Sequence, residues 1–66
     1  MRRITICEGY TKSNRSFKLV LTHGGLYLYY PATGHQKRFN QEQYTEDSDF
    51  TSVKADLVGR GFRIGR

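Results

Sequence analysis

A chain of 66 residues is about half the usual length of one domain, which excludes a second independently folded domain within it. Hydrophobic residues make up 36% of the chain, and a chain of this size buries only ~60% of the surface that it exposes when unfolded. We therefore expect one small domain over residues 1 to 66, with a homodimer as a second route to an adequate core. Eleven Lys and Arg residues against six Asp and Glu residues give a net charge of +5, which favours an anionic partner.

The number of cysteines and the length of the apolar runs indicate the cellular compartment of the protein. Cys7 is the single cysteine, which excludes an intramolecular disulfide and a multi-cysteine zinc site. The longest apolar run extends only from Leu26 to Tyr30, so the sequence predicts neither a secretory leader nor a membrane span. We expect a cytoplasmic protein with no membrane partner.

The first predicted elements are three strands. Residues 3 to 7 alternate polar and apolar positions, which predicts a strand with Ile4 and Ile6 pointing inward. Residues 17 to 22 and 26 to 30 are two further alternating runs, and they flank Gly24-Gly25. Both glycines tolerate the positive φ of a type I′ turn, so this segment predicts a hairpin with a two-residue loop.

A second turn predicts a third strand of the same sheet. Pro31 fixes its own φ and Gly34 tolerates the left-handed conformation, so a turn is expected at residues 31 to 34. Gln36 to Phe39 would then form the returning strand. Residues 17 to 39 are thus predicted to form a three-stranded antiparallel meander.

The last predicted elements are a helix and a short strand. The apolar residues of segment 50 to 58 fall at i, i+3, i+7 and i+8, which is the stripe of a helix over about residues 49 to 58; they are Phe50, Val53, Leu57 and Val58. Ser48 or Asp49 is expected to cap its start and Gly59 to end it. Phe62 and Ile64 alternate with Arg63 and predict a terminal strand beside residues 3 to 7. The fold class that follows is α+β, with a small antiparallel sheet packed against one short helix.

The predicted registers divide the meander into an apolar face and an open face. With Gly24-Gly25 as the loop, the helix would cover the face of Leu19, Leu21 and Leu28, whereas Lys18, Tyr27 and Tyr29 would lie on the other face. A three-residue second loop, Ala32-Thr33-Gly34, would add Lys37 and Phe39 to the open face. The same register leaves Arg38 on the core face, where a charged side chain must reach outward to solvent. This residue counts against the register.

The open face and the chain end supply the candidate binding residues. Lysines attract phosphates, and flat rings offer stacking surfaces for unpaired bases or bulk for a protein contact. Tyrosines are also common in strands with one solvated side, which is the plain structural alternative. The arginines of segment 59 to 66 could contact phosphates as well. The candidate binding residues are Lys18, Tyr27, Tyr29, Lys37, Phe39, Arg60 and Arg63.

Catalytic residues are scarce in this sequence. Cys7 with His23 or His35 could supply a nucleophile and a base, but no activating motif accompanies them, and a lone cysteine in a strand is usually a small buried hydrophobe. We predict no enzyme activity, no metal and no cofactor. The sequence favours a small basic protein that binds DNA or RNA, of the kind found in bacteria, phages and plasmids. The alternative is a small phage-type inhibitor that docks on a host protein.

Overall fold

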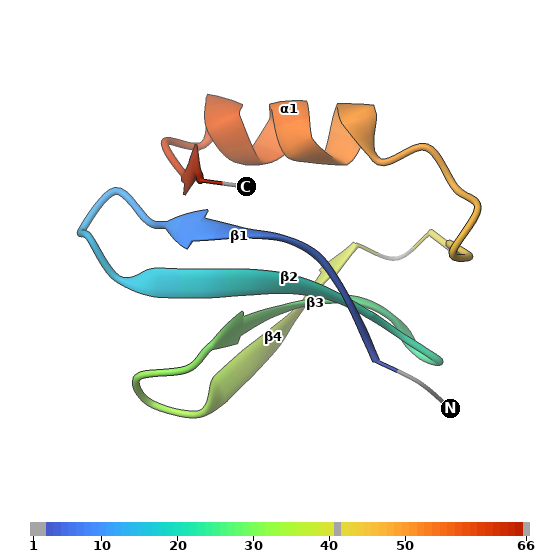
Figure 1. The fold of residues 1–66 in the computed structure, drawn as a ribbon, viewed down its shortest axis with the longest axis horizontal. Helices are drawn as coiled ribbons and strands as arrows, with labels where there is room; N and C mark the ends of the chain where they lie inside the picture. The colour runs from blue at the N-terminus through green and yellow to red at the C-terminus, as the bar shows by residue number, and fades with distance from the viewer. Residues whose placement is uncertain (1–2, 41, 66) are drawn as a thin grey trace.

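The computed structural model describes residues 3–40 and 42–65 and shows a five-stranded antiparallel sheet with one helix packed against it (Figure 1). Along the sheet the strands are ordered β4-β3-β2-β1-β5. The predicted α+β class is confirmed: β2, β3 and β4 form a meander at one end of the sheet, and the strands near the two chain ends, β1 and β5, lie beyond β2. The elements in chain order are β1 (Ile4–Tyr10), β2 (Ser16–Thr22), β3 (Gly25–Tyr30), β4 (His35–Asn40), α1 (Thr51–Gly59) and β5 (Arg63–Ile64).

The β2–β3 hairpin differs from its predicted register by two residues. Thr22 pairs with Gly25 and Leu19 with Leu28, so His23 and Gly24 form the loop. The Thr22 hydroxyl accepts a hydrogen bond from the Gly24 N–H at 3.1 Å and donates one to the Gly25 carbonyl at 3.1 Å. Because side chains alternate with a period of two, this shift leaves every residue of both strands on its predicted face.

The β3–β4 hairpin differs from its predicted register by one residue, which reverses the faces of β4. Tyr30 pairs with His35, and its carbonyl accepts hydrogen bonds from the Thr33 and Gly34 N–H groups, so the loop has four residues. Gly34 has a φ of +72° at the end of this loop. The prediction that Lys37 and Phe39 share a face with the β3 tyrosines is therefore wrong.

A bulge in β1 changes which of its residues are buried. The pairing with β2 shifts between Thr5 and Cys7, so Ile6 is the inserted residue. After the bulge the side chain opposite Leu19 is that of Cys7, which is 3% exposed, whereas Ile4 and Ile6 are only partly buried. Cys7 is thus the buried small hydrophobe that the sequence predicts.

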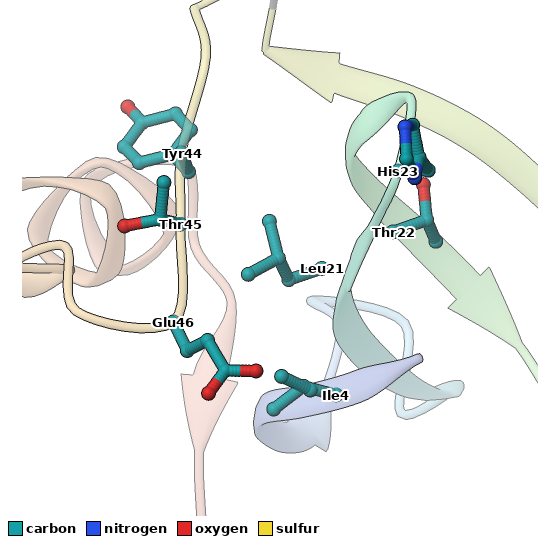
Figure 2. Close-up of a pocket in the computed structure, with 7 residues that line it drawn as sticks. All are labelled: Ile4, Leu21, Thr22, His23, Tyr44, Thr45 and Glu46. Atoms are coloured by element: carbon teal, nitrogen blue, oxygen red, sulfur yellow. The ribbon is translucent and has the colours of Figure 1, made fainter. Parts of the chain in front are cut away.

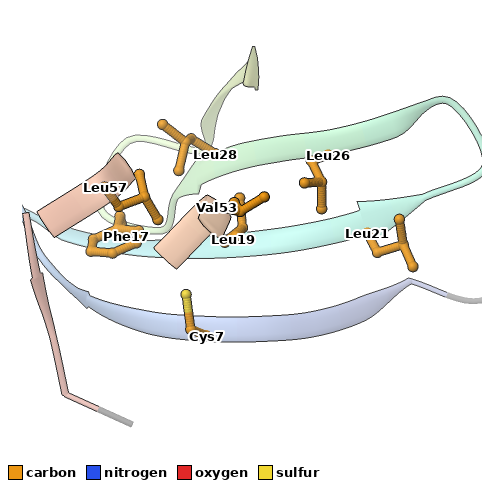
Figure 3. Close-up of a cluster of buried hydrophobic side chains, with 8 residues drawn as sticks. All are labelled: Cys7, Phe17, Leu19, Leu21, Leu26, Leu28, Val53 and Leu57. Atoms are coloured by element: carbon orange, nitrogen blue, oxygen red, sulfur yellow. The ribbon is translucent and has the colours of Figure 1, made fainter. Parts of the chain in front are cut away.

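The core lies between α1 and one face of the sheet. Val53 and Leu57 of the helix point onto the side chains of the strands in Figure 3, and they are 4% and 0% exposed. Val58 does not belong to this stripe because it is 58% exposed. The buried cluster consists of Cys7, Phe17, Leu19, Leu21, Leu26, Leu28, Val53 and Leu57.

The two ends of α1 agree only in part with those predicted. Phe50 occupies the N-cap position, and its side chain makes no capping hydrogen bond. Asp49, the residue before it, accepts a hydrogen bond from the Thr51 N–H at 2.9 Å. At the other end the chain reverses at Gly61, which has a φ of +97°. The Gly61 N–H donates a hydrogen bond to the Val58 carbonyl, and the Phe62 N–H donates one to the Leu57 carbonyl. This is the pattern of a Schellman motif. Gly59, the predicted end, is the last residue of α1, and Gly61 is the left-handed residue that reverses the chain after it.

The C-terminal strand β5 is attached to β1 at a glycine. Gly9 pairs with Ile64 and Tyr10 pairs with Arg63, farther along β1 than the expected residues 3 to 7. A Cβ atom on Gly9 would lie 1.8 Å from the Arg63 carbonyl oxygen, so only glycine fits here. The return of β5 also brings the ring of Phe62 edge-on to that of Phe17, with 5.0 Å between centroids.

Candidate nucleic-acid interface

The open face is the side of the sheet opposite α1, and its members follow from the registers. In each antiparallel pair, residues directly opposite each other point to the same side. Starting from Lys18 and Tyr29, the pairing extends the open face to both edges of the sheet. Its basic and aromatic members in β1 to β4, together with Gln36, are Tyr10, Lys18, Tyr27, Tyr29, Gln36 and Arg38. The acidic Glu8 lies on the same face, opposite Lys18, as do Thr5, Ser16 and Thr22.

Two arginines lie over the tyrosine rings of this face. The Arg38 guanidinium is 5.8 Å from the centroid of Tyr27, and its Nη1 donates a 3.5 Å hydrogen bond to the Tyr27 hydroxyl. The Arg3 guanidinium is 5.9 Å from the centroid of Tyr29, and its Nη2 donates a 3.2 Å hydrogen bond to Gln36 Oε1. Both arginines are exposed whereas both rings are half-buried. The outermost groups on this part of the face are therefore guanidinium groups that lie against aromatic rings.

Charge is divided between the sheet and the segment that follows it. Described residues 3–40 carry six basic side chains and one acidic one, Glu8, which faces Lys18 across the β1–β2 pair. Residues 42–65 carry three basic and five acidic side chains. The five acids, which all precede or belong to α1, are Glu42, Glu46, Asp47, Asp49 and Asp56. Residues 3–40, which form β1 to β4, are thus strongly cationic, whereas the connection that follows them and α1 are net acidic.

Three of the seven candidate binding residues lie away from the open face. The shifted β4 register turns Lys37 and Phe39 to the other side of the sheet, and Phe39 packs against the core. Arg60 lies 5.3 Å from the centroid of Phe39 and forms a 3.2 Å ion pair with Asp56. These contacts tie the end of α1 to β4 and offset the charge of Arg60.

The other four candidates and several missed residues lie on the open side. Lys18, Tyr27 and Tyr29 share the open face as expected, and Arg63 pairs with Tyr10 at its β5 edge. Sequence reasoning did not include Arg3, Tyr10, Gln36 or Arg38. The signal for Arg38 was present, because a charged residue placed on an apolar face is costly and favours the neighbouring register.

A cavity on the acidic side has a different character. It encloses about 320 Å³ between the start of β1, the end of β2 and the connection that leads to α1. In Figure 2, Ile4 and Leu21 lie between Tyr44 and Glu46 on one side and His23 on the other. Because acidic residues follow on this connection, the cavity is an unfavourable place for phosphates.

The titratable groups give no indication of acid–base or metal chemistry. Burial raises the pKa of the Cys7 thiol above its ordinary value, which opposes the thiolate that a nucleophile requires. Over residues 3–40 and 42–65, no three His, Cys, Asp or Glu side chains gather closely enough to hold a metal ion. In the same residues, no helix is long and apolar enough to cross a membrane.

Comparisons with protein-family models, curated proteins and solved structures find no match to this chain.

Proposed function

We propose that this protein binds nucleic acid through the open face of its sheet, without catalysing a reaction. The observation that carries the proposal is the separation of charge, with six basic residues and one acid in residues 3–40. Three of these cations, Arg3, Lys18 and Arg38, lie on or over the open face. Arg38 also lines a small pocket with Glu42, at the start of the acidic segment. A polyanion that approaches this side meets a surface on which positive charge exceeds negative charge.

The arginine–tyrosine pairs support this function because they hold guanidinium groups outward in fixed positions. A guanidinium donates several N–H groups in one plane, which suits phosphate oxygens and the edge of guanine. The contacts of Arg3 with Gln36 and of Arg38 with Tyr27 orient the two groups before a ligand arrives. Such ordering lowers the entropy cost of forming the complex.

The test compares two neighbouring cations on opposite faces of β4. Arg38→Gln and Lys37→Gln each remove one positive charge, and they differ in the side of the sheet that they affect. Fluorescence anisotropy with labelled DNA and RNA, single-stranded and duplex, is measured over a salt series. For the parent we expect a log–log salt slope of about −2 to −3, corresponding to three phosphate contacts.

The salt slope of the Arg38→Gln variant should be shallower by the value for about one phosphate contact, whereas Lys37→Gln should leave the slope unchanged. Equal effects of the two variants would contradict the open face as the binding surface. If neither DNA nor RNA binds at low salt, the nucleic-acid function is wrong, and pull-down from nuclease-treated lysate then tests the alternative of a protein partner.

A further inference from the structure

A groove at the β1–β5 edge of the sheet has features that the rest of the open face lacks. It encloses about 390 Å³ and is lined by Tyr10, Asn14, Arg63, Ile64 and Gly65, none of which is acidic. Small-ligand sites commonly enclose about 300 to 1,000 Å³, so the groove can hold a group of moderate size. Tyr10 and Arg63 are cross-strand partners, so an aromatic ring and a guanidinium belong to the same groove.

Tyr10 presents the most accessible aromatic surface of the sheet. Its side chain is 52% exposed, whereas Tyr27 and Tyr29 are half-buried with arginines beside their rings. A ring can stack on a nucleobase only if one of its faces is open to the ligand. Among the tyrosines of the open face, Tyr10 meets this requirement best.

Arg63 is positioned beside this ring by the β1–β2 turn. Its Nη2 donates a hydrogen bond to Asn14 Oδ1, and Asn14 has a φ of +64° in that turn. The turn is itself held by the buried Thr11, whose hydroxyl accepts hydrogen bonds from the N–H groups of Ser13 and Arg15. The guanidinium is exposed and keeps other N–H groups for an anion.

Further positive charge lies at the same end of the sheet. Lys12 belongs to the β1–β2 turn and packs against Gly61, where an added Cβ would lie 3.2 Å from the lysine Cδ. Arg15 ends the same turn. Both side chains are exposed, so this end of the sheet carries two positive charges in addition to that of Arg63.

We propose that this groove is a subsite for one unpaired nucleotide of a single strand, with the base on the Tyr10 ring and its phosphate on Arg63. The inference rests on the proposed nucleic-acid function and adds a strand preference to it. A base inside a duplex has both faces covered by its neighbours, so only unpaired segments or frayed ends fit this site.

The experiment uses two labelled 12-mers with equal numbers of phosphates, one of thymidylate and one abasic throughout. Their affinities for the parent, Tyr10→Ala, Tyr10→Phe and Arg63→Gln are measured by anisotropy. The parent should bind thymidylate roughly 5- to 100-fold more tightly than the abasic strand, the range for stacking of one base. Tyr10→Ala should remove this preference without changing the abasic affinity, and Tyr10→Phe, which keeps the ring, should retain it.

Arg63→Gln should weaken both strands together and reduce the salt slope by about 0.7, the value for one phosphate of a single strand. Circular dichroism of each variant checks that the fold is retained. A parent without base preference, or a Tyr10→Ala variant that keeps it, would overturn the subsite while leaving the basic face as a binding surface. If the parent binds neither 12-mer, the subsite is wrong, and the titrations with duplex DNA and with RNA then decide whether the nucleic-acid function fails as well.

Discussion

Replacing Leu57 with alanine tests the helix–sheet packing on which the fold depends. The side chain is 0% exposed and belongs to the cluster that α1 shares with the strands. Substitutions of this kind cost about 2 to 5 kcal/mol, because transfer free energy is lost and a cavity remains. At ~0.05 to 0.15 kcal/mol per residue, a chain of 66 residues has a total stability of roughly 3 to 10 kcal/mol. Leu57→Ala should therefore remove a large share of it.

Val58→Ala is the matched control, because it changes the next residue of the same helix. Val58 is 58% exposed, and alanine has the higher helix propensity, so this variant should stay within ~0.5 kcal/mol of the parent. Urea unfolding followed by far-ultraviolet circular dichroism measures both midpoints. If Leu57→Ala shifted the midpoint no more than Val58→Ala does, the assigned buried face of α1 would be refuted.

Two further predictions concern β5 and the buried thiol. Gly9→Ala should detach β5, because the new Cβ would lie 1.8 Å from the Arg63 carbonyl oxygen. In hydrogen exchange the Gly65 amide, which bonds to the Glu8 carbonyl, should lose protection, while the amides of β2 and β3 keep theirs. Unchanged protection of Gly65 would contradict the close approach. Burial raises the pKa of Cys7, so its contribution to stability is complete below about pH 8.5 and falls at higher pH, where the unfolded thiol ionises first. Unfolding measured from pH 7 to 10 should show this fall in the parent, and a Cys7→Ala variant with the same fall would contradict it.

The sequence predicted the correct face for each side chain where the register error was an even number of residues, and the wrong face where it was odd. Placing the β2–β3 loop one residue too late shifted the predicted pairing by two residues. The faces of Lys18, Tyr27 and Tyr29 were still right because side chains alternate with a period of two. The β3–β4 register was misplaced by one residue, and the faces of Lys37 and Phe39 were wrong. The face of a candidate residue can therefore be predicted only as well as the turn that precedes its strand.

The remaining site residues depend on tertiary contacts that no local pattern contains. Arg3, the residue before β1, reaches Tyr29 and Gln36, which lie 26 and 33 positions along the chain. The bulge of β1 at Ile6 has no distinctive sequence signal. Tyr10 pairs with Ser16 and Arg63 at the end of β1, on the face opposite the core, and is 52% exposed. Helix periodicity located Val53 and Leu57 in the core, but the same stripe included the exposed Val58.

The two surfaces of the open side predict different responses of binding to salt. Each phosphate bound by Arg3, Lys18, Arg38 or Arg63 releases counterions, so absolute affinity should fall as salt rises. Stacking of a base on Tyr10 releases none, so the affinity ratio of thymidylate to abasic 12-mers should be the same at every salt concentration. Anisotropy titrations of both strands over one salt series measure the ratio, and Tyr10→Ala is the control, with a ratio near one throughout. A ratio that declines with salt as steeply as the affinities would show that the preference comes from extra phosphate contacts, and the assignment of the base to Tyr10 would then be wrong.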